Sequence, residues 1–157
     1  MPRITPFLWF DTEAEEAAEF YCSIFPNSKI TAVSHYTEAG PRPVGMVMTV
    51  SFVLDGQEYT ALNGGPEFKF NEAISLMINC ADQAEVDYYW EKLTDGGQEI
   101  ECGWLKDRYG LSWQVIPAGW EEVYTSGDPG RAERAMQAMM GMKKLDLAAL
   151  QAAADGV

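Results

Sequence analysis

Basic side chains are scarce in this sequence of 157 residues. Its 11 lysines and arginines stand against 24 aspartates and glutamates, which gives a formal net charge of −13. Nucleic acids and anionic membrane surfaces both call for a basic face. The charge balance therefore excludes them as expected partners, and it is most simply explained by solubility.

Cysteines and long apolar runs are also scarce. Cys22, Cys80 and Cys102 are odd in number and far apart, so neither a disulfide framework nor a zinc knuckle is predicted. No apolar run approaches membrane-spanning length, and no basic segment followed by an apolar one opens the chain. We therefore expect a cytoplasmic protein.

What the sequence does contain is a repeated pattern. The apolar run Ile4–Leu8 recurs in character roughly 70 residues later as Ile74–Ile78. Thr12 and Asp82 are each followed three residues on by glutamate, a pairing that caps helix starts. A duplicated unit predicts two similar halves, and two halves that face each other form a cleft for a ligand.

Each half reads as a strand, a helix and three strands. In the first half we expect a helix from Thr12 to Pro26, with Ala14, Ala17, Ala18, Tyr21, Ile24 and Phe25 on its buried stripe. Strands are expected at 3–10, 28–37, 44–54 and 57–63, with a hairpin turn at Asp55–Gly56. In the second half strands are expected at 73–80, 98–104 and 111–117, a helix between Asp82 and Gly96, and a turn at 107–110. The middle strand of this half is only weakly signalled.

The C-terminal segment differs in kind from the two halves. Asp128–Pro129 predicts a helix start, and Asp146 predicts the cap of a last helix. The first of these helices would carry an apolar face that packs against the body or a second subunit. That predicted face consists of Ala132, Met136, Met139 and Met140.

Several motifs carry a resemblance to a known family. The order of elements resembles that of the vicinal oxygen chelate superfamily, and so do the segments Phe7–Asp11 and Ala17–Tyr21. This superfamily includes glyoxalases, bleomycin-resistance proteins and extradiol dioxygenases. The closer resemblance is to its PhnB-like branch, labelled 3-demethylubiquinone-9 3-methyltransferase. The segments that resemble this branch are Asn63–Pro66, Phe68–Ala73, Cys102–Asp107, Tyr109–Gln114 and Met142–Asp146.

The resemblance implies an α+β fold of two βαβββ modules around a shared funnel-shaped cavity. We expect these modules at residues 1–66 and 67–127, paired as one body 1–127, and a C-terminal helical tail at 128–157. Members of the superfamily usually pair, so the resemblance also predicts a homodimer.

Metal enzymes of the superfamily hold a divalent cation at the first strand of each module, a late strand of the first and the last strand of the second. At these positions the resemblance places neutral side chains, namely Thr5, Ser75, Asn63 and Gln114. Such groups bind transition metals far more weakly than imidazole and carboxylate do, and they cannot offset the desolvation of a divalent ion. We therefore predict a metal-free cleft and no cofactor.

Alternation along the first strand of each module puts Thr5, Phe7 and Trp9 on one face, and Ser75, Met77 and Asn79 on one face. If these faces look into the cleft, it is aromatic with small polar groups, as small-molecule sites usually are. The alternative is that the aromatic residues fill the core. The predicted ligand-binding set is Thr5, Phe7, Trp9, His35, Asn63, Ser75, Met77, Trp104 and Gln114.

Two residues are candidates for chemistry. His35 is the single histidine and would be the one obvious general base if it lay in the cleft, although a lone histidine more often lies on the surface. Cys102 is the best candidate for a reactive thiol. A structural role is favoured for it, because only Lys106 and Arg108 are near in sequence to activate it.

The sequence therefore predicts a protein that binds a small organic molecule, of apolar or aromatic character, with no catalysis. The alternative is an enzyme of the vicinal oxygen chelate type, a lyase, isomerase or dioxygenase-like protein, acting on an oxygenated or aromatic substrate. A third possibility is action through a protein partner. A methyl donor of the adenosyl type is commonly held by a glycine-rich turn that opens a helix, and neither Gly64–Gly65 nor Gly96–Gly97 fits that pattern.

Overall fold

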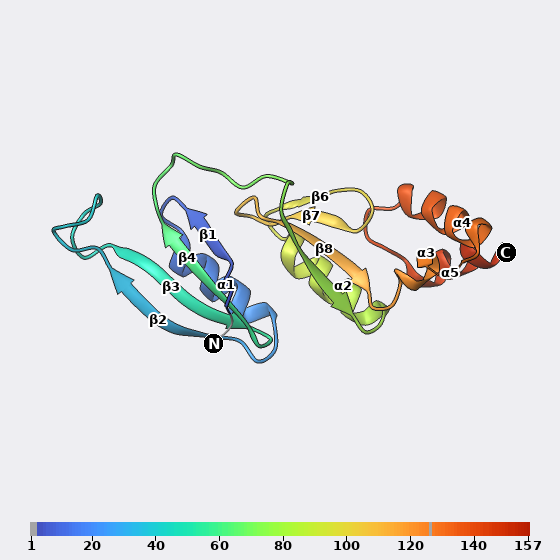
Figure 1. The fold of residues 1–157 in the computed structure, drawn as a ribbon, viewed down its shortest axis with the longest axis horizontal. Helices are drawn as coiled ribbons and strands as arrows, with labels where there is room; N and C mark the ends of the chain where they lie inside the picture. The colour runs from blue at the N-terminus through green and yellow to red at the C-terminus, as the bar shows by residue number, and fades with distance from the viewer. Residues whose placement is uncertain (1–2, 126) are drawn as a thin grey trace. The chain divides into compact units, whose positions relative to one another are not determined.

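The computed structural model describes residues 3–125 and 127–157, and the chain divides into two units, Met1–Phe70 and Asn71–Val157 (Figure 1). Each unit contains a four-stranded sheet and a helix packed on it. The predicted α+β fold of two βαβββ modules with a helical C-terminal segment is thereby confirmed. Every helix in the described residues is too short or too polar to cross a membrane.

The first unit has the sheet order β1-β4-β3-β2. Strand β1 runs parallel to β4, and the other neighbours are antiparallel. The hairpin turn predicted at Asp55–Gly56 is confirmed, since both residues have positive φ angles, of 46° and 87°. The elements are β1 (Phe7–Phe10), α1 (Ala14–Ile24), β2 (Lys29–His35), β3 (Val47–Leu54) and β4 (Gln57–Asn63).

Helix α1 buries the predicted stripe against one face of this sheet. Tyr21 is fully buried, and its ring stacks on that of Phe52 in β3 with 6.4 Å between centroids. The side chains of Leu8 and Phe10 point to the same side, with exposed fractions of 8% and 4%. The core of this unit therefore lies between α1 and the sheet, which leaves the opposite face of the sheet without a helix.

The start of α1 corrects a prediction. Thr12 and Glu15 were expected to cap the helix, but its N-cap is Glu13, which makes no side-chain cap bond. Instead the backbone N–H of Ala14 donates to Oδ1 of Asn63, 2.8 Å away. Phe10 and Asn63 are neighbours in the parallel pairing of β1 and β4, so β4 ends beneath the helix start and can supply the cap.

The second unit repeats this topology in the order β5-β8-β7-β6, with β5 parallel to β8. The predicted cap of α2 is confirmed, because Oδ1 of Asp82 accepts from the N–H of Glu85 at 2.9 Å. The strand expected at 98–104 is two short strands, since Cys102 and Gly103 both have positive φ and interrupt it. The elements are β5 (Ser75–Cys80), α2 (Gln83–Thr94), β6 (Gln98–Glu99), β7 (Trp104–Lys106) and β8 (Ser112–Pro117).

Asp107 organises the turn before β8, as the sequence predicted. Its buried carboxylate accepts hydrogen bonds from the N–H groups of Tyr109 and Leu111, at 2.8 and 3.1 Å. It also accepts from Nε1–H of Trp113 at 2.9 Å. The turn therefore fixes the side of β8 on which Trp113 lies, and with it the direction of every side chain along that strand.

Three helices follow β8: α3 (Glu122–Thr125), α4 (Pro129–Met140) and α5 (Leu147–Asp155). The caps predicted at Asp128 and Asp146 are confirmed. Of the predicted apolar face, Met136 and Met140 are 42% and 62% exposed within the single chain, so their packing on a second subunit stays a prediction. The helix is turned so that Ala135, Ala138 and Met139 face inward, at helical spacing. The cluster that they join consists of Trp120, Val123, Leu145, Leu150 and Ala154.

This C-terminal segment is attached to the sheet of the second unit. The N–H groups of Cys102 and Gly103 donate to the carbonyls of Met142 and Lys143, each at 2.8 Å. A Cβ on Gly103 would lie 3.1 Å from the side chain of Leu145, so glycine is needed at this approach. Two of the motifs that carry the resemblance, Cys102–Asp107 and Met142–Asp146, are thus in direct contact.

Helix α2 supplies a second attachment through Gln83. Its Nε2 donates to the carbonyl of Leu145 at 3.0 Å, and its Oε1 accepts from the N–H of Leu147 at 2.8 Å. On the next turn of α2, Asp87 forms an ion pair with Lys144 at 2.9 Å. Side chains of α2 therefore fix the segment that leads into α5.

Candidate functional site

The first unit exposes aromatic side chains on the face that α1 does not cover. Phe7 and Trp9 pair with Thr60 and Leu62 of β4. They alternate along β1 with Leu8 and Phe10, which point toward α1. Phe7 is 58% exposed and Trp9 is half-buried. The structure therefore places these two predicted site residues together on the uncovered face.

Trp9 is held in place by the loop that follows β4. A Cβ on Gly64 would lie 2.4 Å from the indole ring, so the backbone lies directly against that ring. Nε1–H of Trp9 donates to the carbonyl of Gly65 at 2.9 Å, and the ring of Phe68 packs edge-on at 4.9 Å between centroids. The motif Asn63–Pro66 thus positions an aromatic wall.

The other predicted residues of the first unit are not gathered with Trp9. Thr5 is exposed and precedes β1, and His35 is exposed at the end of β2. Its backbone pairs with Val47 in β3, and among residues 3–125 and 127–157 no hydrogen bond or ion pair of the His35 side chain is found. Asn63 is 2% exposed on the α1 side of the sheet, and its Nδ2 donates to the carbonyl of Val47 at 3.0 Å. Both polar ends of the Asn63 amide are therefore bonded to backbone.

The second unit brings its four predicted residues onto one face. Gln114 pairs with Met77 on one side and with Trp104 on the other, so the three form a row across β5, β8 and β7. Nε2 of Gln114 donates to Oγ of Ser75 at 2.9 Å. Since Trp113 and Val115 point toward α2, this row lies on the face that α2 does not cover. Met77 is 52% exposed there.

Sequence reasoning missed two residues on this same face. Ser112 pairs with Ser75 and with Lys106, which forms a second row next to the first. Ser112 is fully buried, and its hydroxyl is the one buried side-chain polar atom without a hydrogen-bond partner in the part of the chain that the structure describes. The alternation of Ser112 with Trp113 was a usable signal, but the pairing with β7 was not readable from sequence.

Lys106 has an acidic neighbour within its own unit. Its Nζ forms an ion pair with Oε1 of Glu72, in the segment before β5. The hydrogen bond from the Lys106 ammonium lowers the pKa of Glu72 below its ordinary value, and the charge of Lys106 acts in the same direction. The ammonium group of Lys106 on this face is therefore already paired with a carboxylate.

The donor groups at the expected metal positions do not fit a divalent cation. Ser75 and Gln114 bond to each other, and the amide oxygen of Asn63 accepts from the start of α1. Thr5 is exposed and adds no charge. Within the described residues no three or more His, Cys, Asp or Glu side chains are grouped so that they could hold a metal ion. Neutral and mutually bonded groups cannot replace the hydration of such an ion.

The three thiols differ in accessibility. Cys80 is fully buried, and desolvation raises its pKa to about 12, with smaller contributions from Glu85 and Asp82. Burial also raises the pKa of Cys22. Cys102 is half-buried, with its Sγ 3.6 Å from Sδ of Met140. The Cys102 thiol thus lies where the C-terminal segment attaches to the second unit. Its described partner, Met140, is not one of the predicted site residues.

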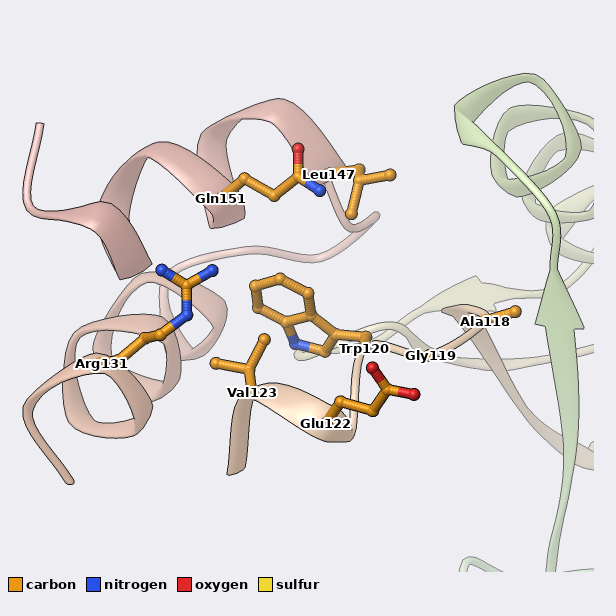
Figure 2. A pocket seen from close by; sticks show the side chains of 8 residues that line it. All are labelled: Ala118, Gly119, Trp120, Glu122, Val123, Arg131, Leu147 and Gln151. Atoms are coloured by element: carbon orange, nitrogen blue, oxygen red, sulfur yellow. The ribbon is translucent and has the colours of Figure 1, made fainter. Parts of the chain in front are cut away.

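A separate concavity of about 320 Å³ lies among the C-terminal helices (Figure 2). Figure 2 shows the indole of Trp120 at its centre, with Arg131 of α4 and Gln151 of α5 beside it. Arg131 is ion-paired with Asp155, and Trp120 is 5% exposed. None of the predicted ligand-binding residues lines this pocket.

Two sheets of the order first-fourth-third-second, each with one uncovered face, form the paired βαβββ fold that the resemblance to the vicinal oxygen chelate superfamily implies. The model of the 3-demethylubiquinone-9 3-methyltransferase family matches residues 2–116, and the chain belongs to that family. The chain is similar to a PhnB protein of Bacillus cereus at 37% identity, with a TM-score of 0.68. That match covers 74% of this chain and 100% of the Bacillus protein.

More distant structures share the fold. Protein PA1353 of Pseudomonas aeruginosa is 20% identical with a TM-score of 0.61, covering 75% of this chain and 98% of that one. The fosfomycin resistance protein FosX of Listeria monocytogenes, in complex with Mn(II) and sulfate, is 14% identical with a TM-score of 0.53. The match to FosX covers 81% of this chain and 98% of FosX. No curated protein matches the sequence.

Proposed function

We propose that this protein binds a small organic molecule, of apolar or aromatic character, without a metal ion and without converting it. The binding surface in this proposal is the sheet face that each helix leaves uncovered. In the first unit it includes Phe7 and Trp9, and in the second it includes Ser75, Met77, Trp104 and Gln114. Thr5 and His35 remain peripheral candidates, and Asn63 is left out because its amide is bonded to backbone.

The observation that carries the proposal is the fixation of Trp9. A large aromatic side chain that merely filled the core would point toward α1, as Phe10 does. Trp9 points to the other side, and a glycine contact, a hydrogen bond and an edge-on ring all restrain it there. An aromatic surface that is rigid before binding loses little conformational entropy when a ligand packs on it.

The methyl transfer named in the family description is not part of the proposal. In the described chain, the turn from β1 to α1 runs through Asp11–Glu13, and the turn from β5 to α2 through Ala81–Asp82. Neither turn contains glycine, whereas the turns that hold adenosyl cofactors are commonly glycine-rich. Gly64–Gly65 leads into Pro66 and no helix.

The test is equilibrium binding of aromatic probes with product analysis. Benzyl alcohol, catechol, phenylglyoxal and a short-chain quinone would be titrated into ¹⁵N-labelled protein, and each mixture would then be analysed for products. Saturable shifts of the Trp9 and Trp104 indole signals, with each probe recovered unchanged, are expected. Conversion of any probe refutes the non-catalytic proposal, and the absence of saturable binding across the panel refutes the binding proposal.

Two variants locate the bound probe. Met77→Ala shortens an exposed side chain at the row of Gln114 and is expected to weaken probe binding about threefold through lost apolar contact. Tyr88→Ala is the matched control, since Tyr88 is 40% exposed on α2, away from the uncovered face. Equal affinities of the two variants would mean that the probe binds elsewhere.

A homodimer is part of the same proposal. Large apolar side chains remain exposed in the described chain, among them Ile4 at 83%, Ile74 at 73% and Met140 at 62%, and a second copy would remove such groups from water. Sedimentation equilibrium is expected to give twice the 17.5 kDa mass of one chain. A mass of one chain at micromolar concentration contradicts the expectation.

A further inference from the structure

A polar row crosses the uncovered face of the second unit beside the apolar row of Met77, Gln114 and Trp104. Ser75, Ser112 and Lys106 occupy facing positions on β5, β8 and β7. Two hydroxyls and one ammonium group are thus adjacent on the same side of the sheet. Such groups are hydrogen-bond donors, and a row of donors is complementary to an oxygen-bearing anion.

The hydroxyl of Ser112 is the reason to assign this row to a ligand. A buried hydroxyl usually has a partner, because burying it without one costs free energy. The Ser112 side chain is fully buried, and its Oγ has no partner, whereas Oγ of Ser75 accepts from Gln114. The unused donor of Ser112 lies between Ser75 and Lys106 in the pairing of the strands.

Glu72 shows what kind of group the row attracts. Its carboxylate pairs with Nζ of Lys106, although the Glu72 side chain is 55% exposed. An exposed ion pair contributes little to stability, so its carboxylate can be displaced at low cost. A ligand carboxylate or phosphonate at Lys106 would replace Glu72 and could also accept from Ser112.

We propose that Ser75, Ser112 and Lys106 form a subsite for the oxyanion of the ligand. The ligand is then an organic acid, a carboxylate or a phosphonate, whose apolar body lies on Met77 and Trp104. This inference rests on the proposed function and makes it more specific, since it assigns charge to one end of the bound molecule.

The experiment compares probes that share one body. Benzyl alcohol, phenylacetate and benzylphosphonate would be titrated into the ¹⁵N-labelled full chain at low ionic strength. Both acids are expected to bind at least about tenfold more tightly than the alcohol, because charge-assisted hydrogen bonds are the strong ones. The order of the two acids distinguishes a carboxylate subsite from a phosphonate subsite, and either order supports the inference.

Variants separate the subsite from general effects on the fold. Lys106→Gln is expected to remove the preference for the acids, and Lys92→Gln, an exposed lysine on α2, serves as its matched control. Glu72→Gln removes the competing carboxylate and is expected to tighten acid binding several-fold. Ser112→Ala is expected to weaken acid binding about fivefold while leaving the urea midpoint unchanged or raised, since it deletes an unpartnered hydroxyl.

The possible outcomes distinguish a failure of the oxyanion subsite from a failure of the proposed small-molecule binding. If all three probes bind with equal affinity to wild type and to Lys106→Gln, the protein binds small molecules but the oxyanion subsite is refuted. If Ser112→Ala lowers the urea midpoint and leaves acid binding intact, its hydroxyl has a structural role and the inference also fails. If no probe binds at all, the proposed function itself falls, and the subsite with it.

Discussion

The cap that Asn63 places on α1 gives a sharp test of how the first unit is stabilised. Asn63→Ala removes the acceptor for the buried N–H of Ala14 and the donor to the carbonyl of Val47. A hydrogen bond contributes about 1 kcal/mol net, and a buried group left unpaired costs about 1–3 kcal/mol. Losing an N-cap costs about 1 kcal/mol by itself. We expect Asn63→Ala to lower the free energy of unfolding by about 3 kcal/mol.

Urea unfolding at neutral pH, followed by circular dichroism, measures this change. With an m-value of about 2 kcal/mol/M, the expected loss shifts the midpoint by about 1.5 M. Amide hydrogen exchange then locates the loss, because the amides at the start of α1 should lose protection more than those of α2. Asn63→Asp keeps the acceptor and suits a helix N-terminus, but it cannot donate to Val47, so an intermediate loss is expected.

The matched control is Asn71→Ala. Asn71 is exposed, and its Oδ1 accepts a single local hydrogen bond from the N–H of Ala73 at 2.9 Å. Its replacement should cost less than about 0.5 kcal/mol. If Asn63→Ala is no more costly than this control, or if α1 and α2 lose protection equally, then the cap does not come from β4 and the account of α1 is wrong.

Three further predictions concern the second unit and the thiols. Gln83→Ala should cost about 2 kcal/mol and speed proteolysis between residues 140 and 147, because it frees the N–H of Leu147 and the carbonyl of Leu145; unchanged cleavage would contradict the attachment. Iodoacetamide at pH 8 should label Cys102 and leave Cys80 intact, as read by peptide mass spectrometry, because Cys80 is fully buried and has a pKa of about 12. The Asp87 carboxylate has its pKa lowered by the hydrogen bonds from Gln83 and Lys144. Since the folded pKa lies below the unfolded one, the stabilisation is present above about pH 4 and is lost as the pH falls through the folded value. Hydrogen-exchange protection around Lys144, taken relative to the intrinsic exchange rate at each pH, should fall in that range, and Asp87→Asn should abolish this fall.

Local signals in the sequence predicted the elements whose causes are local. Asp82, Asp128 and Asp146 each cap a helix within three residues of themselves, and those caps were predicted. Thr12 carries the same signal but is not used, because Asn63, 49 positions after Ala14 in the chain, supplies the acceptor. Whether Thr12 or Asn63 caps α1 depends on the register of β1 with β4, and this register cannot be read from the sequence.

In the candidate site, too, residues placed by local alternation were predictable, and residues placed by strand pairing were not. Alternation along β1 and β5 correctly put Phe7 with Trp9 and Ser75 with Met77, since a strand has a period of two. Lys106 and Ser112 were missed because their neighbours are defined by the pairing of β7 with β8. Within one chain α4 turns Ala135, Ala138 and Met139 inward, which leaves Met136 and Met140 exposed, and the packing of these two on a second subunit stays a prediction.

The contact between the Cys102–Gly103 turn and Met142–Lys143 has a consequence for dissecting the chain. These bonds run from backbone to backbone, so they impose little on the side chains of residues 142 and 143. The family match ends at residue 116, yet removing everything beyond it would leave two amides of a left-handed turn without acceptors and would strip Leu145 from Gly103. The end of the family match is thus not a folding boundary. The last forty or so residues are bonded to the second unit through the main chain, and they contribute to the stability of its sheet.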